Sequence, residues 1–324
     1  MQVDFPPITV LIPTLNEEDY IEQCIRSVLD NGEVAQNIEI LVIDGGSTDS
    51  TKDKVTKLSE THSQLRLIDN PRKIVPAALN IGVSNAKHDI LIWLGAHAIY
   101  DTDYIKKSVE TLINTGAAVV GGVLTAKGKG LFGKALAFAT STKFGIGNAK
   151  YRYATKMQSV DTVFGGCWRK ETVLKAGGFN EQWVRNQDFE FNQRVRDKVG
   201  EIILNPNIRV SYFVRETPKK LAKQYFEYGF WRYKTYKEHP ASLGIRQIIP
   251  LCLVLSFMFS ILILPVSTML AMLAPIFYLC SVVVVSAFEV IRKKRIKYFL
   301  WLLVVYPVLH ISWGVGFLWS AIKR

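Results

Sequence analysis

Short apolar runs alternate with amphipathic stretches over the first 125 residues. Five of these runs, rich in β-branched residues, predict strands at 8–12, 38–43, 65–68, 90–94 and 117–123. Between them, apolar side chains recur at helical spacing, as in Ile21, Ile25 and Val28. This spacing predicts helices after residue 16, after residue 47, over 76–86 and over 104–114. Alternating strands and helices predict an α/β fold with a mostly parallel sheet covered on both faces.

Three polar turn segments directly follow predicted strands: 13–17 (Pro-Thr-Leu-Asn-Glu), 44–49 (Asp-Gly-Gly-Ser-Thr-Asp) and 95–97 (Gly-Ala-His). Ligands of open α/β sheets bind at the carboxyl ends of the strands, so all three segments should face one crevice. A carboxylate there can accept hydrogen bonds from a base or ribose, and glycines let a ligand approach the backbone closely. Asn16, and Ser47 or Asp49, are also predicted to cap the helices that follow; an ordinary turn or helix cap explains each segment taken singly.

The chain changes character near residue 245. Before it, 128–147 is glycine-rich and is predicted to form loops, and basic and aromatic residues over 219–238 predict an interfacial helix. After it, apolar stretches at 248–264, 266–290 and 299–322 predict about three transmembrane helices in a membrane region spanning 246–324. Buried helices of a soluble core are the alternative.

Basic residues set the expected topology. The loop Arg292–Lys297 should lie in the cytoplasm, which with three spans places the domain 1–245 there and the tail Lys323–Arg324 outside. The composition is 49% apolar and 21% charged, with a formal net charge of +12. Lys and Arg are more frequent beside the apolar stretches, where basic residues bind anionic lipid headgroups. No nucleic-acid-binding motif accompanies them, which excludes nucleic acid as the expected partner.

The first two turn segments resemble those of family 2 glycosyltransferases, which have the GT-A nucleotide-sugar-binding fold and invert the configuration at the anomeric carbon of the transferred sugar. The resemblance covers about residues 8–240, and 144–152 and 224–232 are similar to the succinoglycan-type exopolysaccharide enzymes. It implies that Thr14, Glu17 and Asp44 contact the nucleoside. The full set of donor-binding residues expected is Pro13, Thr14, Asn16, Glu17, Asp44, Gly46, Ser47, Arg72 and Ala96.

The third segment departs from the family pattern. The broad family has Asp-x-Asp there and the succinoglycan-type enzymes have Asp-Ala-His, whereas this chain has Gly95-Ala96-His97. The first carboxylate, which would help to hold a divalent metal beside the donor diphosphate, is absent. His97 is the predicted ligand of Mn²⁺, or less well of Mg²⁺, because imidazole favours the later transition metals. Arg72 or Lys73 could share in neutralising the diphosphate, although solvated surface charges explain them equally well.

Further segments resemble the acceptor side of the family. The loop that begins Gly165-Gly166-Cys167 is similar to the family's loop beneath the sugar, or is a simple turn. Gln187-Asp188 matches the Glu-Asp motif, which implies that Asp188 is the catalytic base; a solvated aspartate is the alternative. The expected acceptor-binding residues are Gly165, Gly166, Cys167, Gln193, Arg196, Trp231 and Arg232.

The function expected is transfer of a sugar from a nucleotide sugar, UDP-linked by family frequency, to a polyprenyl-linked or glycan acceptor at the cytoplasmic membrane face. The product would be an exopolysaccharide or another cell-surface glycan, and the partners are the donor, the acceptor and membrane lipids. Two alternatives stay open. One is a membrane-tethered nucleotidyltransferase, and the other is a non-catalytic protein that kept the fold and lost the metal site.

Overall fold

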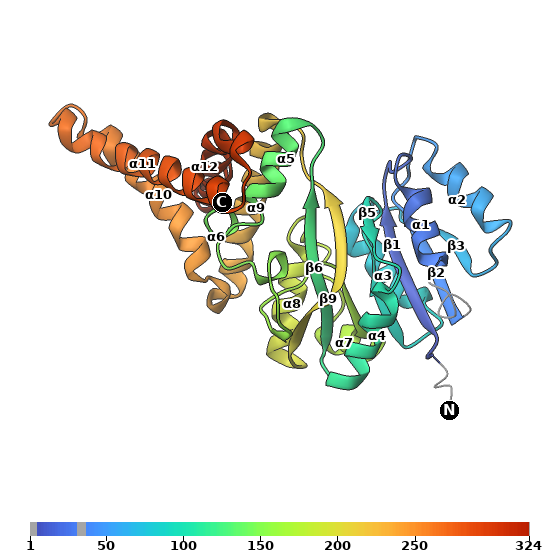
Figure 1. Cartoon of the computed structure of the whole chain (residues 1–324). Helices are drawn as coiled ribbons and strands as arrows, with labels where there is room; N and C mark the ends of the chain where they lie inside the picture. Colours follow the sequence, from blue (N-terminus) through green and yellow to red (C-terminus); the bar gives the residue numbers. More distant parts are fainter. Residues whose placement is uncertain (1–4, 31–36, 324) are drawn as a thin grey trace. The chain divides into compact units, whose positions relative to one another are not determined.

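The computed structural model describes residues 5–30 and 37–323, and the chain forms two compact units (Figure 1). Unit 1 comprises the described residues up to Thr125 together with Lys150–Tyr212, and unit 2 comprises Ala126–Ala149 and the described residues from Phe213 onward. The chain therefore leaves unit 1 after residue 125, returns at residue 150 and leaves it again after residue 212. Arg324, at the end of the predicted outer tail, lies outside the described residues.

A single mixed sheet forms the centre of unit 1. Its strands, in spatial order, are β3 (Leu65–Asp69), β2 (Ile38–Asp44), β1 (Ile8–Thr14), β4 (Ile90–Trp93), β8 (Gly166–Arg169), β6 (Val119–Lys127), β9 (Ile202–Phe213) and β5 (Ala98–Tyr100), with β7 (Gln158–Ser159) paired to β9. The first four strands of this order are mutually parallel. β8 then joins β4 antiparallel, as do β6 to β8 and β5 and β7 to β9. The α/β fold predicted from the alternating pattern is confirmed.

Helices cover both faces of this sheet: α1 (Ile21–Leu29), α2 (Thr51–Ser59), α3 (Val75–Asn85), α4 (Tyr104–Thr115), α7 (Lys170–Ala176) and α8 (Gln187–Lys198). Alternate residues of a strand point to opposite faces. Val10 and Ile12 accordingly pack in one apolar cluster with residues of α1 and α4, while Leu11 packs in a second cluster with residues of α3, α7 and α8. The predicted strands and helices of the first 125 residues are thus confirmed to within a few residues.

The helix caps predicted from the sequence are wrong. α1 begins at Ile21 after Tyr20, and α2 begins at Thr51 after Ser50. Asn16 instead adopts a left-handed backbone conformation, with φ 54°, and its side chain is used in a loop-to-loop contact described below. Short polar side chains can bind nearby backbone in many geometries, so a pattern that suits a cap also suits such a loop.

Unit 2 is helical: α5 (Gly130–Ala139), α6 (Lys143–Ile146), α9 (Pro218–Glu238), α10 (Ile245–Ile263), α11 (Thr268–Arg292) and α12 (Phe299–Ile322). The loops predicted over 128–147 are wrong, since α5 and α6 form there. They form because their phenylalanines pack on aromatic rings of the C-terminal region; the ring of Phe132, for example, lies 5.9 Å from that of Trp301. Tertiary packing overrides the low helix propensity of glycine here.

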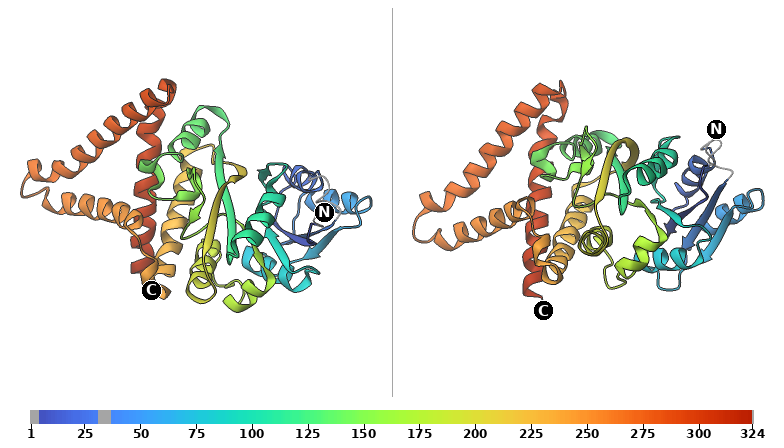
Figure 2. Two further views of the ribbon diagram at one scale, coloured as in Figure 1. Left: turned by 60° about the horizontal axis from the view of Figure 1, so that its bottom comes forward. Right: turned by 90° about the horizontal axis from the view of Figure 1, so that it is seen from below.

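Two segments of unit 2 are long and apolar enough to cross a membrane among the described residues, 268–292 and 296–322. The apolar part of α10, Gln247–Ile263, is shorter. Figure 2 shows α10 and α11 as a hairpin whose tip points away from α12.

Candidate active site

The loops that follow β1 and β2 are tied to each other by side chains. Because β1 and β2 pair in parallel, with Thr14 level with Asp44, the two loops start side by side. The side-chain oxygen of Asn16 accepts a hydrogen bond from the backbone of Thr48 at 2.9 Å, and the Ser47 hydroxyl accepts one from the backbone of Asn16 at 2.8 Å. The backbone of Glu17 donates to the Thr51 hydroxyl at 2.8 Å. The strand register thus brings together the first two predicted donor-binding segments.

Asp44 organises the second loop from within. Its side chain is fully buried at the end of β2. One carboxylate oxygen accepts hydrogen bonds from the backbone of Gly46 at 2.8 Å and of Ser47 at 2.9 Å, and the other accepts one from the Ser47 hydroxyl. Lys52 on α2 lies 3.4 Å from the same carboxylate. Asp44 therefore fixes the shape of the loop that a donor would meet, and Gly46, with φ 81°, supplies a left-handed turn that suits glycine.

The third segment lies at the same edge of the sheet. Trp93 is level with Leu11 of β1, and Gly95 to His97 follow two residues later. The Nδ1 atom of His97 lies 3.0 Å from a carboxylate oxygen of Glu17, which joins the first and third segments. Ala96 is buried, and the Tyr100 hydroxyl accepts a hydrogen bond from the backbone of Gly95 at 2.6 Å.

A metal ion would find two donors in this arrangement, the imidazole of His97 and the carboxylate of Glu17. Among the described residues no group of three or more His, Cys, Asp or Glu side chains could hold an ion. The side chains present do not form a complete metal site by themselves, so we derive no chemical step through a metal. Any further ligands would have to be oxygens of a bound diphosphate or of water, a hard donor class that suits Mn²⁺ or Mg²⁺.

Two basic residues border the second loop. Lys73 has a left-handed backbone, with φ 59°, and its side chain passes about 3.4 Å from the position that a Cβ at Gly46 would occupy. Arg72 pairs with Glu181, and its side chain is still 67% exposed. Lys73 is thus beside the glycine turn, whereas Arg72 would have to give up or share its partner to neutralise a donor.

Close packing requires glycine at the two positions where β8 begins, Gly165 and Gly166. Gly165, with φ 62°, lies so close to the Trp93 carbonyl that a Cβ would come within 2.7 Å of it. At Gly166 a Cβ would come within 2.5 Å of the Trp168 ring. Cys167 is buried, and burial raises the pKa of its thiol. Packing against Trp93 and Trp168 thus accounts for both glycines, and the Cys167 side chain belongs to the core, so the acceptor-binding role of this loop stays a prediction.

Helix α8 carries the predicted catalytic carboxylate in its first turn. Asp188 is half-buried, and one of its oxygens accepts a hydrogen bond from the backbone of Phe189 at 2.8 Å. Glu190 is buried and pairs with Arg194 at 2.5 Å, and Arg194 in turn donates to the backbone carbonyl of Gly178, just after α7. Glu190 thus ties α8, through Arg194, to the turn that follows α7.

The predicted acceptor residues farther along α8 differ in exposure. Gln193 is buried and its amide donates to Asp197 at 3.0 Å, whereas Arg196 is exposed. Trp231 and Arg232 belong to α9 in unit 2. Arg232 is buried there and donates to the Ser242 carbonyl at 2.7 Å, and Lys234 lies 4.2 Å from the Trp231 ring. The acceptor-binding roles of these four residues stay predictions.

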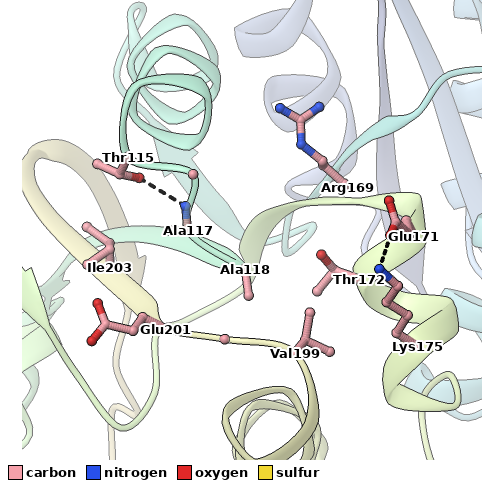
Figure 3. Close-up of a pocket in the computed structure, with 12 residues that line it drawn as sticks. Thr115, Ala117, Ala118, Arg169, Glu171, Thr172, Lys175, Val199, Glu201 and Ile203 are labelled. Carbon is pink, nitrogen blue, oxygen red and sulfur yellow. Dashed lines mark hydrogen bonds and ion pairs between the residues drawn. The ribbon is translucent and has the colours of Figure 1, made fainter.

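A hollow of about 400 Å³ lies at the opposite edge of the sheet (Figure 3). Arg169, one of its lining residues, is level with Ile90 and Ile8, the first residues of their strands. An ion pair between Glu171 and Lys175 lies in its wall. The hollow is therefore at the amino ends of the parallel strands, away from the loops described above.

Comparisons with known proteins agree with this arrangement. Residues 9–178 match the model of the family described as "Glycosyl transferase family 2", which is more than half of the chain. The chain belongs to glycosyl transferase family 2. Within that family it is 33% identical over 244 residues to a protein described as "Succinoglycan biosynthesis protein ExoA" from Rhizobium meliloti, covering 75% of this chain and 74% of that protein.

Other family members and solved structures extend the likeness. The chain is 31% identical over 230 residues to a dolichyl N-acetyl-α-D-glucosaminyl phosphate 3-β-D-2,3-diacetamido-2,3-dideoxy-β-D-glucuronosyltransferase from Methanococcus voltae, covering 68% of this chain and 71% of that enzyme. Its fold is similar to that of the mannosyltransferase PcManGT from Pyrobaculum calidifontis, solved with GDP-Man and Mn²⁺, with a TM-score of 0.65, 18% identity, and coverage of 97% and 87%. This glycosyltransferase thus has the GT-A fold that the sequence predicts.

Two residues of the candidate site were not found from the sequence. Tyr100 holds the backbone of Gly95, and burial raises the pKa of its hydroxyl well above the usual value, so it stays protonated and can also donate. Glu181 holds Arg72 from 109 residues away. Neither has a local motif, because each contact is created by tertiary structure alone.

Proposed function

We propose that this glycosyltransferase moves one sugar from a nucleotide sugar, UDP-linked or GDP-linked, to a lipid-linked or polysaccharide acceptor, with inversion at the anomeric carbon. The loops of Asn16, Asp44 and Ser47 carry the proposal for the donor. They are cross-linked at the carboxyl ends of β1 and β2, where such sheets bind ligands. The names of the two relatives above, one in succinoglycan synthesis and one acting on a dolichyl phosphate sugar, support the acceptor class.

In the proposed reaction the carboxylate of Asp188 accepts the proton of the acceptor hydroxyl. That oxygen forms a bond to the anomeric carbon from the face opposite the leaving group, while the bond from the anomeric carbon to the donor phosphate oxygen breaks. The nucleoside diphosphate leaves with that electron pair, and no covalent intermediate on the enzyme is needed. We further propose that the reaction takes place on the cytoplasmic face of a cell membrane, with the chain held there by a multi-pass membrane region.

The role of Asp188 is tested by Asp188→Asn in the detergent-purified chain. A nucleotide-sugar panel first identifies the donor by release of its nucleoside diphosphate. We then expect kcat for transfer to fall by about 10²- to 10⁴-fold, the usual contribution of a general base, with donor affinity kept.

The matched control for this variant is Glu171→Gln, which removes an exposed carboxylate at the opposite edge of the sheet. It should leave kcat within about a factor of two, as surface substitutions usually do. Equal turnover by Asp188→Asn and the control would contradict the assignment of the base. Absence of release with every donor would instead favour a non-catalytic role.

A further inference from the structure

Helix α12 is the last apolar segment of the chain, and by length and composition it qualifies as a membrane span. The sequence pattern treats it as the third of three spans. Its neighbours within unit 2 argue otherwise, because what a helix touches along its length limits where it can lie.

One face of α12 is covered by α5, α6 and α9 in turn. Near its start, Trp301 packs on Phe132 of α5, with ring centroids 5.9 Å apart. Midway, the Tyr306 ring lies 4.9 Å from Phe144 of α6, and His310 donates from Nε2 to the Phe144 carbonyl at 2.8 Å. These contacts fix α5 and α6 against the first half of the helix.

Helix α9 covers the second half of α12, and the backbones of the two helices lie close together there. A Cβ at Gly229 would come within 1.9 Å of the Trp313 carbonyl, and one at Gly316 within 2.1 Å of the Phe226 carbonyl. The ring of Tyr233 then packs edge-on against Phe317 at 5.3 Å. The glycines let the two helices approach closely over several turns.

The composition of α9 keeps it out of hydrocarbon. Its 21 residues include six Lys or Arg and two Glu, and Lys219, Lys220, Lys223 and Lys237 are exposed. Charged residues inside a bilayer are rare and face protein or water-filled cavities. A helix with so many exposed charges lies in water or at the headgroup level.

The depth of these contacts then decides the orientation of α12. Residues 301 and 317 are about 24 Å apart along a helix, which is most of a hydrocarbon layer about 30 Å thick. If α12 crossed the membrane from a cytoplasmic residue 299, residues 313–317 would lie beyond the midplane, and charged α9 would be held there with them. If α12 lies along the surface, all three covering helices stay at one level.

The opposite face of α12 is apolar and is exposed toward both ends of the helix, whereas in the middle His310 is hydrogen-bonded to Tyr278 of α11 at 2.9 Å. Its exposed large side chains recur at helical spacing on one side: Leu300, Val304, Val315, Trp319 and Ile322.

The α10–α11 hairpin is exposed and apolar on most sides, with Leu262 and Phe277 each 76% exposed. A Cβ at Gly314 would come within 2.4 Å of the Pro250 carbonyl, so the first turns of α10 lie against the C-terminal half of α12. The end of α11, at Arg292, is joined by a short segment to the start of α12 at residue 299. Figure 2 shows the hairpin tip far from α12.

We propose that only the α10–α11 hairpin enters the hydrocarbon layer and that α12 lies in the plane of the membrane surface. Its exposed stripe then faces the lipid chains, and the basic loop Arg292–Lys297 lies among anionic headgroups. The end of α12, including Lys323, is on the same side as α9, which joins unit 1 through only a few residues. This topology places every basic cluster of unit 2 on one side, in agreement with the positive-inside rule.

Sided cysteine labelling of the full chain tests the proposal without needing turnover. Cys252 and Cys280, which are exposed on the hairpin, are first replaced by serine, while Cys24 and Cys167 are buried. Lys323→Cys is compared with Lys57→Cys on unit 1 and with Val266→Cys at the hairpin tip, using a membrane-impermeant maleimide on intact cells and on inverted vesicles.

We expect Lys323→Cys to react from the side on which Lys57→Cys reacts. Reaction of Lys323→Cys only from the opposite side would overturn the proposal and restore α12 as a span. The Val266→Cys variant reports whether the hairpin crosses the membrane fully, and it is expected to react from the side opposite Lys57→Cys.

Depth measurement gives a second readout that does not depend on sidedness. A fluorophore is placed at Leu300→Cys, Ile311→Cys or Ile322→Cys, and its quenching by lipids that carry a quencher at a shallow or a deep position is compared. An in-plane helix predicts the same quenching ratio at all three positions. A ratio that shows position 311 near the bilayer centre and the two ends near the headgroups would reject the in-plane helix, even if the protein were inserted in mixed orientations.

Discussion

At the scale of single residues, Gly95 is a position where this chain departs from the family pattern described in the sequence analysis. The family pattern has a carboxylate there, and this chain has no side chain. The loop itself is intact, because Tyr100 holds the Gly95 backbone and His97 contacts Glu17. What is missing is one charge, so the loss concerns metal affinity and leaves the shape of the site in place.

Restoring the carboxylate by Gly95→Asp is therefore expected to tighten Mn²⁺ binding severalfold, because carboxylate ligands suit this ion. The backbone accepts the change: a Cβ there has its nearest contacts at 3.5 Å, to Phe164, and at 3.8 Å, to Tyr100. Mn²⁺ affinity is measured by titration, from the electron paramagnetic resonance signal of the Mn²⁺ that stays free in solution. Gly95→Asn, of similar size and without charge, is the control, and equal Mn²⁺ affinity of both variants would show that position 95 does not face the ion.

At the scale of elements, β2 carries a buried charge at each end. Asp44 orders the loop at its carboxyl end, and Glu39 lies near its start. Glu39 accepts hydrogen bonds from Thr9 at 2.8 Å, from the backbone of Lys87 at 2.9 Å and from Arg66 at 2.9 Å. These contacts link β1, β2, β3 and the turn before β4, so one carboxylate ties together the parallel half of the sheet.

Glu39 should make the stability of unit 1 depend on pH. Burial alone would raise the pKa of this carboxyl, but the hydrogen bonds from Lys87, Thr9 and Arg66 outweigh it and hold the pKa below its usual range. A depressed pKa stabilises the fold above the unfolded value of about 4.3, and this stabilisation is lost as the pH falls through the folded pKa. We expect the apparent Tm in detergent to fall more steeply below pH 4 for the wild type than for Glu39→Gln.

At neutral pH the same variant should be the less stable protein. Loss of the ionised partner leaves Arg66 and the backbone of Lys87 weakly bonded, at a cost of about 1–3 kcal/mol. Arg66 is partly exposed, which places the cost toward the lower end of this range. Parallel pH profiles of the two proteins would mean that Glu39 is not the group responsible.

Packing between elements can be tested in unit 2 at Gly229. A β-branched side chain there would collide with the Trp313 carbonyl, 1.9 Å from the position of the Cβ. We expect Gly229→Val to separate α9 from α12 and to lower the apparent Tm by several degrees, as overpacking costs about 1–3 kcal/mol. The exposed α9 position Lys223→Val introduces the same side chain without a collision and should change the Tm little. Because valine has a higher helix propensity than glycine, a Tm for Gly229→Val no lower than that of Lys223→Val would contradict the close packing of α9 on α12 at this position.

At the scale of the whole molecule, the proposed donor chemistry and the proposed membrane attachment belong to different units. Unit 1 contains the cross-linked loops and Asp188, and unit 2 contains the apolar hairpin and the charged α9. Segment 126–149 leaves unit 1 between β6 and β7 and becomes part of unit 2. The chain therefore passes between the units three times, near residues 125, 150 and 212.

The requirement of the reaction for a divalent metal ion can be tested with the intact protein. Among the described residues, His97 and Glu17 are neighbouring donors and no group of three His, Cys, Asp or Glu could hold an ion tightly, so we expect nucleoside diphosphate release from the donor to require added Mn²⁺ and to stop with EDTA. Imidazole should make Mn²⁺ more effective than Mg²⁺. Release that survives EDTA would contradict this prediction and would assign charge neutralisation to basic residues such as Lys73.

The sequence alone determined the α/β class, the strand-end position of the three loops and the family, because alternation, helical spacing and turn residues are local properties of the chain. Tertiary structure decided what depends on distant partners. Asn16 and Ser47 bind across two loops instead of capping helices, and 130–139 is a helix because aromatic rings some 160 residues later cover it. The orientation of α12 is of the same kind, since hydropathy records only how apolar a helix is, whereas its charged neighbour α9 limits where it can lie.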